Sequence, residues 1–196
     1  MSTIAIIPAR GGSQRIKYKN IKAFHGQPIM AYSIQKAKES GLFDRIIVTT
    51  DNPNIGSIAA VYGAEVWIRS EEFYSRDSTG TQEVVKECLQ GIHADHYDNV
   101  CCIYATAPLM SVKDLAEGYL ILTSYHAGVV DYVVSVGYPP LHDAGQFYWG
   151  IASNFLNDIT LISCRTRFVL VAEGRDCDIN TEEDWVRAVK LYGELK

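Results

Sequence analysis

The sequence predicts a single α/β domain over residues 1–196, with helices on both faces of a predominantly parallel β-sheet. Short apolar runs of about five or six residues alternate with segments of helical period along the whole chain. No internal repeat, low-complexity stretch or linker divides it. The unusual polar and glycine-rich segments follow the apolar runs, where strands would end and where such sheets bind their ligands.

The expected strands are apolar, β-branched segments that end at proline, glycine or polar residues. The first begins at Thr3 and ends at Pro8, immediately before the segment "ARGGS". The second, "RIIVTT", is dominated by β-branched residues, which favour strands. The expected strands are 3–8, 45–50, 64–68, 100–104, 132–136 and 168–171.

The expected helices have apolar residues at helical spacing between start and stop signals. Pro28 suits the first turn of a helix, and Gly41 and Gly63 each end one. Three acidic residues, 182–184, favour a helix start there because the helix dipole stabilises negative charge at that end. The expected helices are 28–40, 52–62, 81–92, 112–125 and a last one that begins after Thr181.

Composition limits the class of protein. The 196 residues are 47% hydrophobic and 21% charged, which suffices for one full core. A formal net charge of -5 argues against non-specific nucleic-acid binding, and no apolar run reaches the length of a membrane span. The five cysteines show no CxxC spacing, so we expect reduced thiols and a cytoplasmic protein.

The stretch "IIPARGGSQRIKYKN", residues 6–20, combines a strand end, two glycines and a dense group of cations. Directly after a strand, Gly11 and Gly12 can turn their backbone N–H groups toward a phosphate. An ordinary turn with solvated surface charge is the competing interpretation. The stretch matches neither GxxxxGK[ST] nor GxGxxG followed by an acidic residue, so it predicts phosphate binding without indicating a common nucleotide-binding class. The cations are Arg10, Arg15, Lys17 and Lys19, with Lys22 just beyond the stretch.

A second unusual segment, "DCDINTEEDW", covers residues 176–185. Asp178 and Asn180 alternate after an expected strand, so they should point to the same side. Their oxygens suit Mg²⁺, which takes one or two protein oxygens together with water and phosphate. The alternative is that these residues, with Thr181, only cap the last helix.

The segment "IPARGGSQRIKYKNIKAFHGQPIMAYSIQKAKESGLFDRIIVTTD" resembles the opening of the nonulosonic-acid cytidylyltransferases, which make CMP-sialic acids and their bacterial relatives. The similarity continues through "YGAEVWIRS", "DSTGT", "YATAPL" and "DINTEEDW". "HDAGQFYWG" resembles the branch that activates pseudaminic acid. The resemblance implies a Rossmann-like mixed sheet of the nucleotide-diphosphosugar transferase type. It also implies Mg²⁺-dependent transfer of CMP from CTP to the anomeric hydroxyl of a nine-carbon 2-keto acid sugar, with release of pyrophosphate.

The resemblance also assigns roles to individual residues. Arg10 and Lys19 match catalytic cations that bind phosphate. His142 is equally well explained as an ordinary loop residue, and Tyr104 replaces a glutamine of the sialic-acid enzymes, which favours a different sugar. The implied CTP-binding residues are Arg10, Gly11, Gly12, Ser13, Lys19, Asn20, Arg69 and Thr81. The implied sugar-binding residues are Tyr104, His142, Asp143, Gln146 and Tyr148, and the implied metal ligands are Asp178 and Asn180.

Three features depart from the family pattern. Gln14 stands where many relatives have lysine, and Asn180 stands where they usually have aspartate. Relatives also carry a longer segment between Pro139 and His142, including an arm exchanged between the subunits of a homodimer, which is either missing here or left out of this sequence. The alternatives are therefore a CMP-sialic or CMP-legionaminic acid synthetase, or a CTP-binding protein that has lost catalysis.

Overall fold

The computed structural model describes residues 2–70, 80–96, 98–125 and 128–195. Seven strands form the main sheet in the order β5-β4-β1-β6-β8-β7-β9, and a two-stranded hairpin, β2-β3, lies apart from it. The strands are β1 (Thr3–Pro8), β2 (Ala23–Phe24), β3 (Gln27–Pro28), β4 (Arg45–Thr50), β5 (Glu65–Ile68), β6 (Asn99–Ile103), β7 (Tyr132–Gly137), β8 (His142–Ile151) and β9 (Thr166–Leu170). The helices are the 3-10 turn η1 (Lys19–Ile21), α1 (Ile29–Ser40), α2 (Pro53–Val61), α4 (Thr81–Gly91), α5 (Val112–Thr123), α6 (Ala152–Leu156) and α7 (Glu182–Glu194).

The sheet is mixed because of a single strand. β1 pairs in parallel with β4 and β6, and β7 pairs in parallel with β9, whereas β8 runs antiparallel to both of its neighbours. β8 was not among the expected strands. Both faces of β8 are covered, and residues 144–150 are all buried, so the sequence shows no alternation of polar and apolar residues there. All the strands and helices that the sequence predicts are confirmed, with ends shifted by at most two residues.

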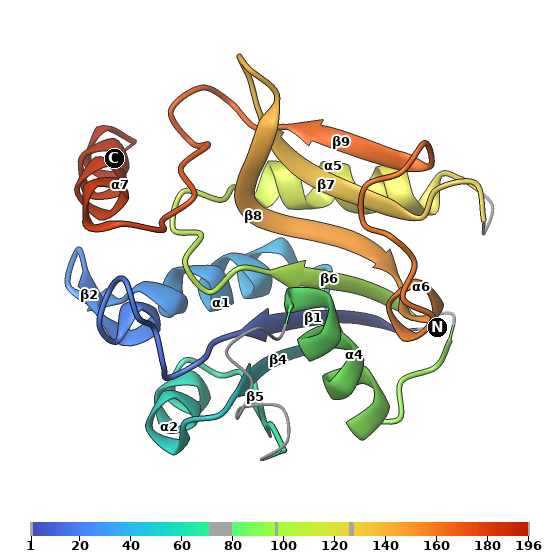
Figure 1. Cartoon of the computed structure of the whole chain (residues 1–196), viewed down its shortest axis with the longest axis horizontal. Helices are drawn as coiled ribbons and strands as arrows, with labels where there is room; N and C mark the ends of the chain where they lie inside the picture. The colour runs from blue at the N-terminus through green and yellow to red at the C-terminus, as the bar shows by residue number, and fades with distance from the viewer. Residues whose placement is uncertain (1, 71–79, 97, 126–127, 196) are drawn as a thin grey trace.

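Helices cover both faces of the sheet (Figure 1). α1, α2 and α5 pack on one face, and α4 and α6 pack on the other. Each face has its own apolar core, with Ile7, Val48 and Trp149 in the first and Ile6, Tyr132 and Phe155 in the second. Among the described residues, no helix is both long and apolar enough to cross a membrane.

The C-terminal helix α7 lies beyond the end of the sheet, beside the β2-β3 hairpin (Figure 1). A third apolar cluster joins them, in which Ile16 and Phe24 from the N-terminal part of the chain contact a group that includes Ile179 and Trp185. Ile16 and Ile179 are fully buried. The chain segments before α1 and around α7, about 160 residues apart in sequence, therefore share one core.

Candidate functional site

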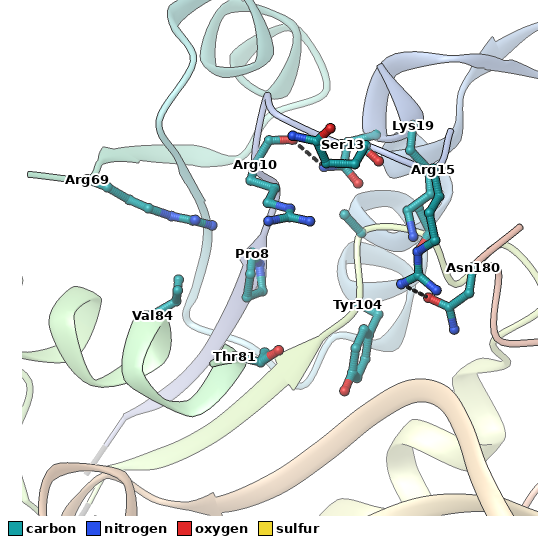
Figure 2. Close-up of a pocket in the computed structure, with 14 residues that line it drawn as sticks. Pro8, Arg10, Ser13, Arg15, Lys19, Arg69, Thr81, Val84, Tyr104 and Asn180 are labelled. Atoms are coloured by element: carbon teal, nitrogen blue, oxygen red, sulfur yellow. Dashed lines mark hydrogen bonds between the residues drawn. The ribbon is translucent and has the colours of Figure 1, made fainter. Parts of the chain in front are cut away.

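A cavity of about 320 Å³ opens beside the carboxyl ends of β1 and β6 (Figure 2). The segment from Ala9 to Lys22, here called the N-terminal loop, forms one wall. The start of α4 and the end of β6 form the opposite side. The lining residues are Pro8, Arg10, Ser13, Gln14, Arg15, Lys19, Asn20, Arg69, Thr81, Val84, Tyr104, Ala105, Thr106 and Asn180.

Backbone contacts fix the shape of the N-terminal loop. The Gly11 N–H donates to Oδ1 of Asp51 at 2.6 Å, and the Asn20 side-chain amide donates to the Arg10 carbonyl at 2.8 Å. Tyr18 adopts a left-handed backbone with φ of 54° before the turn η1. The N–H of Gly11 is thus committed to Asp51, while Gly12 has open space around its α-carbon.

Among the described residues that line the cavity, four are cations and none is acidic. Arg10, Arg15 and Lys19 come from the N-terminal loop, whereas Arg69 follows β5. Figure 2 shows Arg10 and Arg69 on one side of the space and Arg15 and Lys19 on the other. Burial lowers the pKa of Lys19 most, the charge of Asp178 opposes this shift, and the neighbouring cations lower the pKa further. Asp178 and the other acids whose charges act on Lys19 and Arg69 lie outside the described cavity lining, and a wall that gathers positive charge suits a polyanionic ligand.

Arg69 is held in place by its own sheet rather than by an acid. Its Nε donates to Thr49 Oγ1 at 3.3 Å and its Nη2 to the Thr49 carbonyl at 3.1 Å. Arg69 is buried, and this burial is the main cause of its lowered pKa. An anionic ligand would therefore gain a preoriented, partly desolvated guanidinium that can bind two oxygens at once.

Two cations of the N-terminal loop lie away from the cavity lining. The Lys17 ammonium lies over the Tyr18 ring, 5.4 Å from its centroid. The Lys22 ammonium lies 2.7 Å from Oε2 of Glu182 and 4.6 Å from the centroid of the Trp185 ring. The structure thus divides the five cations noted in the sequence into three that line the cavity and two that do not.

Tyr104 and Thr81 place hydroxyl groups on the side of the cavity opposite the N-terminal loop (Figure 2). Tyr104 follows β6 directly, and its carbonyl accepts a hydrogen bond from Ser33 Oγ at 2.8 Å. Burial raises the pKa of the Tyr104 hydroxyl well above its usual range, so it stays a neutral donor. The cations would bind any polyanion, whereas these neutral hydroxyls can distinguish ligands by their hydrogen-bond donors and acceptors.

The other predicted sugar-binding residues lie on β8, outside the cavity lining. Tyr148 is 2% exposed and packs within the core, and Gln146 is 1% exposed with its amide donating to the Arg175 carbonyl. His142 is exposed, with Nε2 3.3 Å from Oδ2 of Asp176. Burial raises the pKa of Asp143, and the charge of Asp178 raises it further, whereas the hydrogen bond from the Gly145 N–H lowers it. None of these four β8 residues is among the residues that line the cavity.

Asp178 and Asn180 lie together, but not directly at a strand end. β9 ends at Leu170, and a turn precedes Asp178, so that part of the expectation is wrong. Locally the alternation holds, since Ile179 is buried between the two polar residues. The Asn180 amide donates to the Asp178 carboxylate, and its Oδ1 accepts from Arg15 Nη2 at 3.2 Å.

The side chains of Asp178 and Asn180 do not cap α7, although the Asn180 backbone N–H donates to the Asp184 carboxylate at 2.9 Å. Thr181 is the N-cap of α7: its hydroxyl accepts from the Asp184 N–H, and its own N–H donates to the Asp184 carboxylate. Asp178 and Asn180 contribute no side-chain oxygen to that cap. One carboxylate and one amide oxygen beside a cationic cavity fit Mg²⁺, whose remaining ligands are then water and phosphate. No group of three His, Cys, Asp or Glu side chains suitable for a metal occurs within the described ranges.

Sequence reasoning missed two residues that shape the site. Asp51 holds the Gly11 backbone and Thr49 holds Arg69. Both belong to "TTD" at the end of β4. The position of Asp51 at a strand end could have marked it as a site residue. Its hydrogen bond with the Gly11 N–H was not predictable, because it depends on the parallel pairing of β4 with β1.

Comparisons with known proteins agree on one family. The profile of the family described as "Cytidylyltransferase" matches residues 4–128. A pseudaminic acid cytidylyltransferase of Campylobacter jejuni subsp. jejuni serotype O:23/36 is 30% identical over 224 residues, covering 98% of this chain and 97% of that protein. An N-acylneuraminate cytidylyltransferase of Escherichia coli O18:K1:H7 is 36% identical over 129 residues, covering 64% of this chain and 30% of that protein.

Solved structures share the fold at low sequence identity. A CMP:2-keto-3-deoxy-manno-octonic acid synthetase complexed with CTP has a TM-score of 0.80 at 14% identity, with 100% of both chains covered. A Mycobacterium tuberculosis protein in complex with manganese has a TM-score of 0.69 at 15% identity, covering 97% of this chain and 99% of that one.

Proposed function

The chain belongs to the cytidylyltransferase family, and we propose that it transfers CMP from CTP to the anomeric hydroxyl of a nonulosonic acid. Pyrophosphate is the second product. The observation that carries the proposal is the cavity whose described lining holds four cations and no acid, because this charge complements that of a triphosphate. The fold is shared with a synthetase that was solved with CTP bound.

In this proposal the cations hold the triphosphate while the sugar hydroxyl attacks the α-phosphorus. Arg10 and Lys19 are the catalytic cations, since they lie on the wall made by the N-terminal loop and face the cavity. Fixed positive groups stabilise the charge that develops on the phosphates without reorganising during the reaction. Gly11 and Gly12 shape the turn between these cations.

The remaining CTP-binding roles follow from position on the cavity wall. Arg69 approaches from the β5 side as a preoriented cation, and Thr81 offers a hydroxyl from the start of α4. Ser13 and Asn20 line the N-terminal loop side, although the Asn20 amide nitrogen already bonds to the Arg10 carbonyl. Hydroxyl and backbone groups of this kind distinguish a base by its donors and acceptors.

Asp178 and Asn180 are the proposed ligands of Mg²⁺. Their oxygens lie beside Arg15 and next to a cavity suited to phosphate, and Mg²⁺ prefers carboxylate, amide, water and phosphate oxygens. When bound, the ion would help neutralise the departing pyrophosphate. The Asp178 carboxylate supplies the negative charge of the pair, and Asn180 supplies an oxygen without charge.

Pseudaminic acid is the proposed sugar. The Campylobacter jejuni relative named for this sugar aligns with nearly the whole of both chains, whereas the N-acylneuraminate relative aligns with less than a third of its own length. Tyr104 on the cavity wall, with His142, Asp143, Gln146 and Tyr148 on the adjoining strand, forms the proposed sugar-binding region. Sialic and legionaminic acids are the alternative substrates.

Pyrophosphate release from CTP and Mg²⁺, measured separately with pseudaminic, sialic and legionaminic acid, tests this function. We expect the highest kcat/KM with pseudaminic acid. Release with none of the three sugars would contradict the proposed reaction. If calorimetry then showed CTP binding at millimolar Mg²⁺, the chain would be a CTP-binding protein without catalysis, an alternative favoured by Gln14 on the cavity wall and by the uncharged Asn180.

We also propose a homodimer and a reducing compartment, the cytoplasm. Phe168 and Leu170 are exposed on the edge strand β9, and Tyr138 and Leu141 are exposed on the β7-β8 connection, which gives an apolar surface for a second copy. All five cysteines are free, as in most cytoplasmic proteins. Light scattering on the purified chain measures the mass that decides between monomer and dimer.

The β7-β8 connection is also the proposed position of residues that relatives have and this chain lacks. Residues 138–141 join the two strands directly. The alignment with the Campylobacter jejuni protein spans 224 residues, more than the 196 of this chain, so that relative carries residues without a counterpart here. The gene sequence between Pro139 and His142 tests whether an arm is encoded there.

A further inference from the structure

α7 and the segment that leads into it contact the N-terminal loop at several points. The Arg15 guanidinium donates to the Asn180 side chain at 3.2 Å, and the Lys19 ammonium donates to the Ile179 carbonyl at 2.7 Å. Between these two cations, the fully buried Ile16 belongs to the same apolar cluster as Trp185 of α7. Two of the three cavity cations of the N-terminal loop, Arg15 and Lys19, therefore contact the segment that leads into α7.

Lys22 makes the contact that joins the end of the loop to the helix itself. Its ammonium donates to both carboxylate oxygens of Glu182, at 3.0 and 2.7 Å, and lies 4.6 Å from the centroid of the Trp185 ring. The Lys22 N–H bonds to the Tyr18 carbonyl at 2.9 Å and so closes the turn η1, which begins at Lys19. A displacement of Lys22 would be transmitted through this turn to Lys19.

We infer that α7 is a positioning element for the cavity and that Lys22 is its positioning residue. Lys22 does not line the cavity, so it acts on a ligand only through the N-terminal loop. Three cations of the loop, Arg10, Arg15 and Lys19, line the same cavity, and their like charges repel one another. Contacts with α7 oppose that repulsion and keep the loop close to the form that binds an anion.

Hydrogen exchange of the loop amides is the direct test. The N–H groups of Lys19, Ile21 and Lys22 are bonded inside the loop and report its opening. Lys22→Met and Glu182→Gln should each speed exchange of these amides about two- to fivefold, the size expected for one exposed cation–π or ion-pair contact. Lys22→Arg should restore the wild-type rate, since arginine keeps both contacts.

A second ion pair on α7 provides the matched control. Lys190 and Glu194 lie 3.9 Å apart, and both are exposed on the last turns of the helix. Lys190→Met should leave exchange of the loop unchanged. If Lys22→Met instead speeds exchange equally in β1, β4 and β6, the contact only stabilises the whole fold and the inference is overturned. Unchanged exchange in Lys22→Met overturns it as well.

The consequence for CTP rests on the proposed function, whereas the effect on loop exchange does not. Lys22→Met should raise KM for CTP about two- to fivefold, with kcat within twofold of wild type, because a looser loop weakens binding in ground and transition states alike. A faster-exchanging loop with unchanged KM would overturn the positioning role. If the wild type fails to use CTP, the proposed function falls, and loop exchange alone decides the inference.

Discussion

The carboxylate of Asp51 accepts a hydrogen bond from the backbone N–H of Gly11 at 2.6 Å, tying the turn of the N-terminal loop to the end of β4. Charge-assisted bonds of this kind are short and strong. The neighbouring Asn52 caps α2 through its side chain and packs against Gly11. The loop is therefore held at both ends, by Asp51 at the β-sheet and by the residues around α7.

Gly11→Ala is expected to reduce kcat/KM for CTP by about tenfold or more. A β-carbon at Gly11 would lie 2.8 Å from the side-chain nitrogen of Asn52 and 2.9 Å from its β-carbon, so the loop must shift. Overpacking of this kind destabilises a fold by about 1–3 kcal/mol unless the backbone moves. A movement that displaces Arg10 and raises the activation barrier by about 1.4 kcal/mol would lower activity about tenfold. The measurement is steady-state turnover with CTP varied.

Gly12→Ala is the matched control for that change. A β-carbon at Gly12 meets no atom within 4 Å, and the backbone there is not left-handed. We expect activity within about twofold of wild type. Equal losses from the two substitutions would show that chain flexibility, rather than the contact with Asn52, explains the need for glycine.

Arg10→Ala and Lys19→Ala should each lower kcat/KM by about 10²-fold or more, the usual effect of losing one preorganised electrostatic contact. Both residues line the cavity. Lys17→Ala is expected to be mild, because Lys17 lies over the Tyr18 ring and away from the cavity lining. Folded variants at positions 10 and 19 with wild-type turnover would exclude the assigned roles.

The sequence predicted the strands that bear the site, because β1, β4 and β6 are uninterrupted apolar runs bounded by polar residues. It also predicted a cationic loop. The division of the cations between cavity and surface was not predictable. Lys17 and Lys19 lie on either side of Tyr18, whose backbone is left-handed. The Lys17 ammonium lies over the Tyr18 ring, whereas the Lys19 ammonium reaches the Ile179 carbonyl. A non-glycine residue in this conformation has only a weak sequence signal.

Tertiary contacts decide the rest of the site. Asp51 meets Gly11 only because β4 pairs in parallel with β1, and Arg69 meets Thr49 because β5 pairs with β4. Such pairings are set by packing of the whole sheet rather than by local pattern. The family resemblance implied that Tyr148 binds sugar, and the sequence did not show that Tyr148 lies on a strand buried on both faces and packs in the core.

Burial of the cysteines predicts a pH dependence of stability. It raises the pKa of Cys88 and of Cys102 from 9.0 to about 12. Between these values the folded state binds more protons than the unfolded state, so the free energy of unfolding should fall as pH rises above about 9. Thermal unfolding measured between pH 8 and 10.5 checks this, and Cys88→Ala should reduce the slope.

The exposed Cys164 is the control for that experiment. Cys164→Ser should leave the pH dependence of unfolding unchanged while removing the thiol that reacts fastest with a disulfide reagent at pH 8. A slope unaffected by Cys88→Ala would mean that groups other than this thiol cause the loss of stability at alkaline pH.

A Mg²⁺ titration of activity at saturating CTP tests the proposed metal ligands. Asp178→Asn leaves two neutral amides beside a highly anionic triphosphate, so activity should become undetectable at ordinary Mg²⁺ concentrations. Asn180→Asp should lower the Mg²⁺ concentration needed for half-maximal activity, because a second carboxylate adds negative charge where the Asn180 amide now bonds to Asp178. It should also strengthen the contact with Arg15, whose guanidinium already donates to this side chain.

The contact with Arg15 provides the control that separates charge from metal binding. Arg15→Gln removes the cation but leaves both oxygen ligands in place, so it should weaken CTP binding while the half-maximal Mg²⁺ concentration at saturating CTP changes little. If Asn180→Asp acts only by pairing with Arg15, it should no longer change the Mg²⁺ curve when it is combined with Arg15→Gln. Identical Mg²⁺ curves for the wild type, Asp178→Asn and Asn180→Asp would place the metal site elsewhere. In that case Asp178 and Asn180 would serve only to hold the N-terminal loop against the segment before α7.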